Sequence, residues 1–142
     1  MQRIWRLWSE NRENLERLYP KLPTSVFQAD LNPSNLLIDE EGKFVGVLDF
    51  NLCGKDVFLN YLMRENDSDS IPTALEAAAR YYAFSEAEKE AALPLYRCLK
   101  PLWYGSVGEL RKAGSDPEAV RRCLDRAEGP LTNDIDFKRH MG

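Results

Sequence analysis

Residues 26–51 read VFQADLNPSNLLIDEEGKFVGVLDFN, and the fold expected for the chain follows mainly from these residues. It begins with a short apolar entry and continues with polar residues around a proline, which is the composition of a loop. Residues 35–38 are apolar and strand-like, residues 39–42 supply turn residues, and residues 43–50 return as a second strand. The stretch predicts a β-hairpin with positive φ at Gly42 and a second strand covered on both faces.

A helical pattern precedes the hairpin. Residues 1–19 place apolar side chains, among them Trp5 and Trp8, on one face of a helix, with arginine, glutamate and asparagine on the other. Prolines at positions 20 and 23 end this pattern. Aromatic stripes at helical spacing usually pack on a core, so we expect this face to be covered.

Helical patterns also follow the hairpin, from Val57 onward. Ile71-Pro72-Thr73 is predicted to open a helix that runs through Phe84. Ser85 and Glu88 then match a capping box, in which each side chain accepts a hydrogen bond from the other residue's backbone N–H. The sequence therefore predicts a new helix directly after Ser85.

Prolines divide the remaining helical sequence. Pro94 and Pro101 predict two helices or one kinked helix in an apolar stretch that includes Trp103. The last helix is predicted to begin at Asp116-Pro117 and to run to about Arg126. Gly129 and a second proline after it are expected to lie beyond its end.

Length and composition limit the classes of protein. With 142 residues, of which 44% are hydrophobic, the chain is expected to form a single domain over residues 1–142 with a sizeable core. A net charge of −4 lacks the basic footprint of nucleic-acid binding, so no nucleic-acid partner is expected, whereas a small cationic substrate is permitted. No apolar run approaches the roughly 18 residues of a membrane span. We expect a cytoplasmic protein with no membrane partner and reduced cysteines.

Three polar side chains stand out in this hairpin region: Asp30, Asn35 and Asp49. Closing the hairpin brings the start of its first strand beside the end of its second, so Asn35 and Asp49 are expected to be neighbours, with Asp30 one loop away. Two carboxylates and an amide oxygen are hard oxygen ligands that suit Mg²⁺. The alternative interpretation is that each residue caps a turn or a helix, as Asx residues routinely do.

Together these residues resemble the catalytic core of the aminoglycoside phosphotransferase and choline kinase family, relatives of the protein kinases. The loop of that family reads HxDxxxxN and is followed by two strands and a D-F/W-x metal motif. Asp30 matches the loop aspartate, Asn35 the asparagine, and Asp49 with Phe50 the metal motif. Residues 54–62 (GKDVFLNYL) resemble the family's GDPxxDL, and Asp56 matches its first aspartate.

The resemblance implies an α+β, mainly α fold: the C-terminal lobe of a protein kinase-like phosphotransferase, with helices around a small β-hairpin that carries the catalytic and metal loops. It implies transfer of the ATP γ-phosphate to a hydroxyl of a small molecule such as an aminoglycoside or amino alcohol. Asp30 would be the catalytic base, and Asn35 and Asp49 would hold Mg²⁺ and through it the nucleotide. No match to the family's N-terminal nucleotide lobe is found in the sequence, so the chain is expected to be either a fragment of a longer enzyme or a naturally short remnant. As an isolated fragment it is expected to be inactive and to permit self-association through its exposed lobe interface.

Several positions depart from the family pattern, and Asn32 and Ser34 replace the histidine and glycine common in its HGDLHPGN form. Gln28 replaces the histidine before the loop aspartate; the side chain there mostly braces the loop, and a glutamine can still donate a hydrogen bond. Asn60 replaces the second aspartate of GDPxxDL, which normally supports the loop from behind. An amide can do part of that work without the charge.

Other interpretations remain open. Acidic residues such as Asp56, Glu65, Asp67 and Asp69 could meet a cationic amine substrate, or residues 65–69 could form a solvated acidic loop. The chain could instead be a non-catalytic, kinase-lobe-derived helical module that binds a protein or ligand. An unrelated helical bundle with a chance motif ranks last.

Overall fold

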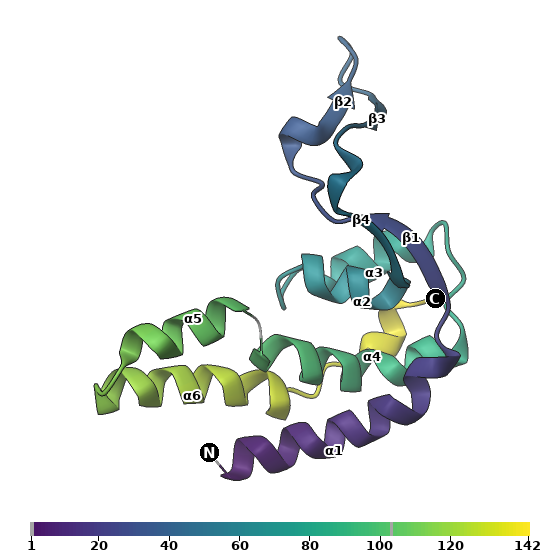
Figure 1. Ribbon diagram of the computed structural model, residues 1–142. Coiled ribbons are helices and arrows are strands. Elements are labelled where there is room, and N and C mark those ends of the chain that lie inside the picture. The colour runs from purple at the N-terminus through teal and green to yellow at the C-terminus, as the bar shows by residue number, and fades with distance from the viewer. Residues whose placement is uncertain (1, 103) are drawn as a thin grey trace. The chain divides into compact units, whose positions relative to one another are not determined.

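A computed structural model describes residues 2–102 and 104–142, and most of them are helical (Figure 1). The expected class, α+β and mainly α, is confirmed, and the strands form two small antiparallel sheets. Trp103, expected in an apolar helical stretch, lies outside the described residues, as does Met1. The chain divides into two compact units, a helical unit (Met1–Leu22 and Leu62–Gly142) and a hairpin unit (Pro23–Tyr61). The single domain expected over residues 1–142 stays a prediction.

The helical unit is built from helices on both sides of the hairpin in the sequence. Helix α2 begins in the hairpin unit and ends in the helical unit, and the other helices lie wholly in the helical unit. Their bounds are α1 (Gln2–Leu18), α2 (Phe58–Glu65), α3 (Ile71–Ala79), α4 (Glu86–Leu99), α5 (Tyr104–Ala113) and α6 (Pro117–Thr132).

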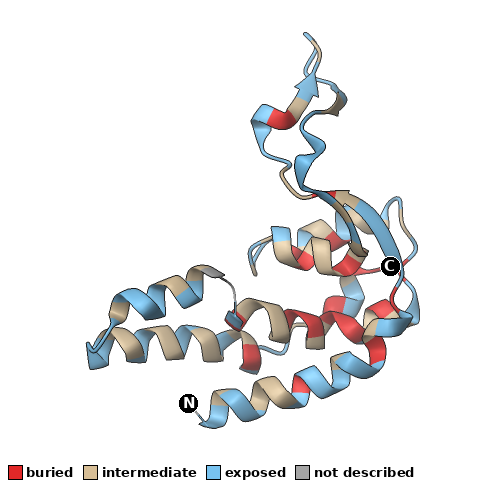
Figure 2. Cartoon of the chain, viewed as in Figure 1, coloured by how far each residue is buried: buried red, intermediate tan, exposed pale blue. Residues whose placement is uncertain are grey.

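Helix α4 is the centre of the helical unit's core. It packs along α1 and also contacts α6 and the short C-terminal 3₁₀ helix Phe137–His140. Leu95 and Tyr96 on α4 are 2% and 1% exposed, and the Tyr96 ring lies 5.3 Å from that of Phe137. Figure 2 shows buried residues concentrated on α4. Burial of this apolar surface is the main source of the unit's stability.

Local capping signals in the helical unit are confirmed. The Ser85 and Glu88 side chains form the complete capping box at the start of α4. Glu88 is fully buried and also accepts a hydrogen bond from the Tyr82 hydroxyl at 3.0 Å. Partial burial and this hydrogen bond raise the pKa of Tyr82 to about 12. Asp116 caps α6 by accepting from two backbone N–H groups, with Pro117 in the tolerated first turn.

Two predicted helix ends are wrong. Helix α3 ends at Ala79 rather than Phe84, and the backbone N–H groups of Tyr81 and Tyr82 both turn back to the Ala78 carbonyl. Helix α6 continues beyond Arg126 to Thr132 with Pro130 inside it.

The reasons lie in burial and hydrogen bonding. Tyr81 is 92% exposed, so a continued α3 would gain little apolar burial there. In the last turn of α6, Leu131 is 2% exposed, and the Asn133 N–H donates to the Gly129 carbonyl at 3.0 Å. These contacts offset the hydrogen bond that Pro130 cannot make.

The covered face expected for the first helix is only partly present. Leu18 is buried and Trp8 half-buried, but Trp5 is 66% exposed. Trp5 instead stacks on Trp8, with ring centroids 5.5 Å apart. Among residues 2–102 and 104–142, no helix combines the length and the apolarity that crossing a membrane requires.

The hairpin unit contains two antiparallel pairs of strands. Strands β2 (Leu36–Ile38) and β3 (Phe44–Val47) form the predicted hairpin. Gly42 in its turn has φ +79°, which confirms the positive φ expected there. Strands β1 (Thr24–Gln28) and β4 (Cys53–Val57), which pair residue by residue, were not predicted.

The expectation that the second hairpin strand is covered on both faces is wrong. Phe44 and Val45 on β3 are 66% and 62% exposed. Each sheet of the described chain has two strands, and a ribbon of two strands supplies no second layer to cover its faces.

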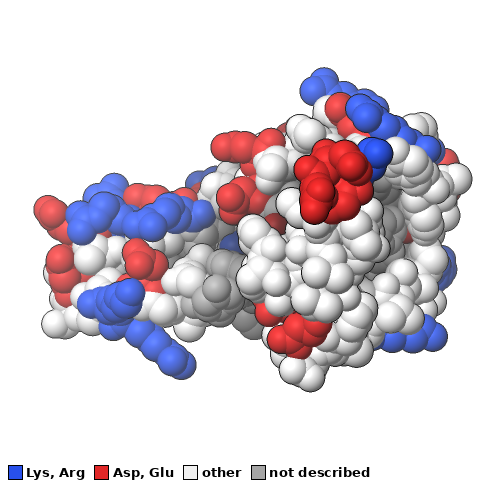
Figure 3. Space-filling view, turned by 90° about the horizontal axis from the view of Figure 1, so that it is seen from above, with Lys and Arg blue, Asp and Glu red and all other residues white. Residues whose placement is uncertain are grey.

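Charge on the protein surface is mixed in sign. The chain has 19 lysines and arginines against 23 aspartates and glutamates. Figure 3 shows the two signs interspersed on the face in view, without one large basic patch.

Candidate active site

The loop after β1 holds the Asp30 side chain between two asparagines. Asn35 donates from Nδ2 to the Asp30 carboxylate at 3.0 Å and to the Asp30 carbonyl at 2.8 Å. Asn32 donates from Nδ2 to the other carboxylate oxygen at 2.7 Å. Since both carboxylate oxygens are bonded, the side chain is fixed in one orientation.

The same asparagines fold the loop. The Asn32 side-chain oxygen accepts from the Ser34 N–H at 3.0 Å and caps the short 3₁₀ helix Pro33–Asn35. Asn35, the last residue of that helix, is 9% exposed. Asn32, which the sequence marks only as a departure from the family pattern, is therefore a structural member of the loop.

Asp49 lies beside Asn35 at the open end of the hairpin. The last ladder pair joins Leu36 to Val47, and beyond it the Leu48 N–H donates to the Asn35 carbonyl at 2.8 Å. Asp49 is the next residue along the chain. The structure thus brings Asn35 and Asp49 together as neighbours across the hairpin end, while the bond between Asn35 and Asp30 adds the third side chain.

Asp49 has an unusual backbone. Its φ of 53° and ψ of 77° lie in the left-handed region, and it is the one described non-glycine residue with positive φ. Such conformations cost energy in most residues and cluster at active sites and ligand clamps. The Asp49 carboxylate also accepts from the Asn51 N–H at 3.3 Å. The capping role considered for Asp49 is therefore present, but it engages only one carboxylate oxygen.

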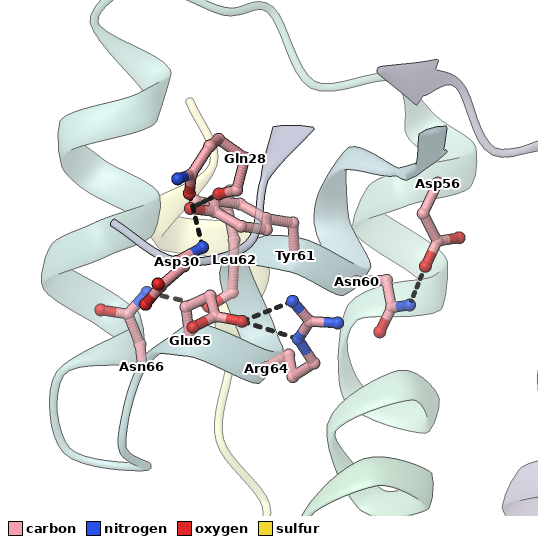
Figure 4. Close-up of polar contacts among 9 residues, drawn as sticks. All are labelled: Gln28, Asp30, Asp56, Asn60, Tyr61, Leu62, Arg64, Glu65 and Asn66. Atoms are coloured by element: carbon pink, nitrogen blue, oxygen red, sulfur yellow. Dashed lines mark hydrogen bonds and ion pairs between the residues drawn. The ribbon is translucent and has the colours of Figure 1, made fainter. Parts of the chain in front are cut away.

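Gln28, in the position of the family's histidine, connects these two loops. Its Nε2 donates to the Asp49 carbonyl at 2.7 Å and to the Leu48 carbonyl at 3.3 Å. Its Oε1 accepts from the Asp30 N–H (Figure 4). Gln28 is 7% exposed. The expectation that this glutamine can still donate a hydrogen bond is confirmed, and the structure adds the bond that it accepts.

The paired strands β1 and β4 add backbone contacts to the link that Gln28 makes between the two loops. Gln28 pairs with Cys53 at the end of the sheet, and the next residue, Ala29, donates its N–H to the Leu52 carbonyl at 3.1 Å. The Tyr61 hydroxyl donates to the Gln28 carbonyl at 3.2 Å (Figure 4). The two loops are therefore joined through backbone as well as side chain.

Gly54 on β4 allows the aromatic packing beneath this sheet. The Phe27 ring stacks on Tyr61 with centroids 5.5 Å apart. A Cβ atom on Gly54 would lie 3.2 Å from Phe27 Cζ, closer than ordinary van der Waals contact. A larger residue there would displace the ring that packs on Tyr61.

Asn60 bonds to Asp56. Its Nδ2 donates to one Asp56 carboxylate oxygen at 2.6 Å (Figure 4). The other oxygen accepts from the Val57 N–H at 2.7 Å. Asn60 Oδ1 is buried and has no hydrogen-bond partner among the described residues. The hydrogen bond from the Asn60 side chain thus goes to Asp56, just before the start of its own helix α2.

The acidic residues considered for substrate binding are partly neutralised. In the helical unit, the Glu65 carboxylate lies 2.6 Å from the Arg64 guanidinium (Figure 4). Lys100 donates from Nζ to the Asn66 carbonyl, and burial lowers the pKa of Lys100 although Asp67 and Glu65 oppose the shift. A cationic substrate bound at this acidic segment would be repelled by the nearby Arg64 and Lys100 side chains.

The chemistry of the donor set fits a small hard cation. The Asn35 amide nitrogen is occupied by Asp30, which leaves the amide oxygen available for coordination. The neighbouring Asp49 supplies carboxylate oxygen, and Mg²⁺ prefers such ligands. The described residues contain no cluster of three or more His, Cys, Asp or Glu side chains that could hold a metal.

Comparison with known proteins assigns the family. Comparisons with curated proteins and with solved structures find no match. Residues 1–102, which include Asp30, Asn35 and Asp49, match the model of the family described as "Phosphotransferase enzyme family", abbreviated APH. The match covers most of the 142 residues, and this family implies a kinase-like fold. The chain therefore belongs to the APH phosphotransferase family.

Proposed function

We propose that this chain is the catalytic and substrate-binding C-terminal lobe of a small-molecule kinase. The reaction is transfer of the ATP γ-phosphate to a hydroxyl of a small molecule, with aminoglycosides and amino alcohols as the substrate classes to test first. One observation carries the proposal: Asp30, Asn35 and Asp49 meet at the open end of one hairpin in a member of a phosphotransferase family.

Asp30 is the catalytic base in this proposal. Its carboxylate accepts a hydrogen bond from the substrate hydroxyl, orients that oxygen toward the phosphate, and takes its proton. Asn32 and Asn35 hold the carboxylate from two sides, at 2.7 and 3.0 Å, so its orientation is set before the substrate arrives. Such preorganisation matters because phosphoryl transfer depends chiefly on positioning and charge neutralisation.

Asn35 and Asp49 are the residues that would hold Mg²⁺, through the amide oxygen and the carboxylate. When bound, Mg²⁺ neutralises the negative charge of the nucleotide phosphates. The left-handed backbone of Asp49 separates this residue from the strand before it and from the 3₁₀ helix after it. Gln28 holds the Asp49 carbonyl and thereby fixes where this backbone turns.

The direct test is phosphate transfer by the full-length product of the gene. The protein is incubated with Mg²⁺ and γ-labelled ATP and with a panel of aminoglycosides, choline-like amines, amino alcohols and sugars. We expect labelled product with at least one class, dependent on Mg²⁺. Glu40→Ala, which removes an exposed carboxylate in the same unit, is the matched control for every site variant.

The competing function is that of a non-catalytic binding module. The orphaned Asn60 oxygen favours it, since the family's second aspartate is absent and its replacement is incompletely bonded. A folded full-length protein that neither binds Mg-ATP nor labels any acceptor would establish this alternative and contradict the kinase.

A further inference from the structure

An apolar pocket of about 210 Å³ lies in the helical unit, between α1, α5, α6 and the short 3₁₀ helix Lys100–Leu102. Eleven described residues line it; nine are apolar, and the other two are Ser106 and Cys123. None of these eleven side chains carries a formal charge. The pocket shares no residue with the candidate active site in the hairpin unit.

Trp5 and Trp8 form an aromatic wall of this pocket, with ring centroids 5.5 Å apart. Trp8 is held in place, because its Nε1 donates to the Cys98 carbonyl at 3.2 Å and the Arg12 guanidinium lies 5.7 Å from the ring centroid. Trp5 is 66% exposed, although aromatic side chains gain much from burial. An aromatic ligand against this wall would cover apolar surface of Trp5 and would add aromatic contacts.

Contacts among the lining elements form the pocket without a ligand. Helix α6 contacts both α1 and α5 (Figure 1). Arg3 Nε on α1 lies 3.0 Å from Glu128 Oε1 on α6, and Arg126 Nη1 on α6 lies 3.7 Å from Glu109 Oε2 on α5. The 3₁₀ helix also contacts α6, and its Pro101 is buried. A ligand therefore enters a site that is already formed, which lowers the entropy cost of binding.

We propose that this pocket binds a small, uncharged, planar aromatic molecule of one or two fused rings. A cavity of about 150 Å³ is enough for benzene, and this pocket is larger by roughly the space of a further small ring. A charged ligand would leave its charge unpaired against uncharged walls, which is costly. The Ser106 hydroxyl offers one hydrogen bond, so a ligand with a single polar group fits best. The inference does not depend on the proposed kinase reaction.

Size and charge both favour a small molecule over a second copy of the chain as the occupant. Eleven described residues line the pocket, whereas a stable protein–protein interface takes about 20–30 residues a side. The ion pairs Arg3–Glu128 and Arg126–Glu109, which adjoin lining residues in the sequence, each join opposite charges of one chain. They leave no excess charge of either sign to attract a protein partner.

The first test is calorimetric titration of the full-length protein with 2-naphthol, a two-ring aromatic with one hydroxyl. We expect a dissociation constant between about 1 μM and 1 mM, a range consistent with a ligand of this size. 2-Naphthoate carries a carboxylate in place of the hydroxyl, and it should bind at least about tenfold more weakly because its charge has no partner in the pocket. Absence of 2-naphthol binding at about 1 mM, or equal affinity for the two probes, would overturn the inference.

Cys123 in the pocket wall reports where the probe binds, without any substitution. The protein is alkylated with iodoacetamide in the absence and presence of 2-naphthol at about ten times its dissociation constant, and mass spectrometry follows each thiol. Occupancy of the pocket should slow alkylation of Cys123 about tenfold. Cys53, which is exposed in the hairpin unit, should react at an unchanged rate. Equal rates at Cys123 with and without the probe contradict binding in this pocket.

Val107→Asp tests the apolar wall directly. Val107 is 40% exposed, so we expect the variant to fold, while its carboxylate stands in the wall and lowers the affinity for 2-naphthol at least about tenfold. Val45→Asp is the matched control, because Val45 is a 62% exposed valine outside the pocket, and it should leave the affinity unchanged. Equal affinity in Val107→Asp and wild type would sink the assignment.

The same measurements would recognise two other occupants. Binding of 2-naphthol that appears only in Trp103→Ala would show that the chain itself fills the pocket. A dimer that 2-naphthol dissociates, followed by sedimentation analysis, would show that a second copy is the occupant. Either result overturns the inference of a small-molecule site.

Discussion

The helical unit and the hairpin unit are stabilised in different ways. In the helical unit, large apolar side chains such as Leu95, Ile71 and Met63 are 2% exposed or less. In the hairpin unit, Ile38 and Phe44 are 67% and 66% exposed, whereas the polar Gln28 and Asn35 are 7% and 9% exposed. The hairpin unit buries Val57 and Leu59, which are 2% and 0% exposed, together with these two amides, but it leaves large apolar side chains of its hairpin exposed.

Charge separates the units as well. Pro23–Tyr61 contains six acidic and two basic side chains, a net charge of −4, and the rest of the chain has 17 of each sign. The whole net charge of the protein therefore resides in the smaller unit, which carries the candidate site. We therefore expect stability and the proposed chemistry to depend largely on different residues, so that substitutions should separate them.

The largest effect is expected for Asp30→Ala. Loss of the proposed base should lower kcat by about 10²- to 10⁴-fold, because general-base catalysis contributes that much. Mg-ATP binding, followed by calorimetry on the full-length protein, should be retained. An Asp30→Ala protein with wild-type turnover would remove Asp30 from the chemistry, and Glu40→Ala should be indistinguishable from wild type.

Asp49→Ala should abolish Mg-nucleotide binding and not only turnover. The substitution removes the carboxylate of the proposed metal site and leaves Asn35 without its partner ligand. Calorimetric titration with Mg-ATP measures the effect. Equal nucleotide affinity in wild type and Asp49→Ala would contradict the assignment of this residue.

Leu95→Ala should break the helical unit while leaving the site intact. The residue is 2% exposed in the core, and truncation of a buried leucine costs about 2–5 kcal/mol of unfolding free energy. Urea denaturation measures the loss. At temperatures where the variant is folded, Mg-ATP affinity should equal that of wild type; a parallel loss would mean that the units are not separable in this way.

Ser85→Ala should have a smaller effect of the same kind. It removes the cap of α4 and leaves the fully buried Glu88 with fewer donors. N-cap losses cost about 0.5–2 kcal/mol. The midpoint of thermal unfolding should fall modestly, and a change in acceptor KM would not be expected.

Phe44→Ser should have the smallest effect on stability. Phe44 is 66% exposed on β3, and substitutions at exposed positions usually change unfolding free energy by less than about 0.5 kcal/mol. The comparison with Leu95→Ala contrasts a large apolar side chain in each unit. A loss in Phe44→Ser as large as that in Leu95→Ala would show that the exposed face is covered in solution, and sedimentation analysis would then test the predicted self-association.

Local features were predictable from the sequence because they depend on residues a few positions apart. Ser85 and Glu88, Asp116 and Pro117, and the turn glycine Gly42 each behave as predicted. The neighbouring positions of Asn35 and Asp49 follow from closing a single hairpin. The catalytic and metal roles of these residues stay proposals.

Features that depend on distant segments were not predictable. The sequence predicts an apolar entry to a loop from Val26 onward, because the strand Thr24–Gln28 is defined only by its pairing with Cys53–Val57. The exposure of Phe44 could not be foreseen from its alternation, which indicates a strand but not what covers it. Pro130 inside α6 was excluded by local rules that the burial of Leu131 overrides.

The order Asp30, Asn35, Asp49 and the family to which it points can be read from the sequence alone, since motif order and capping are local properties of the chain. How the two loops are joined depends on the tertiary structure. Gln28 at the end of β1 meets the backbone of Asp30 on one side and of Asp49 on the other. That contact exists because strand pairing and hairpin closure bring backbone groups from distant positions to one buried amide, and no spacing rule encodes such a meeting.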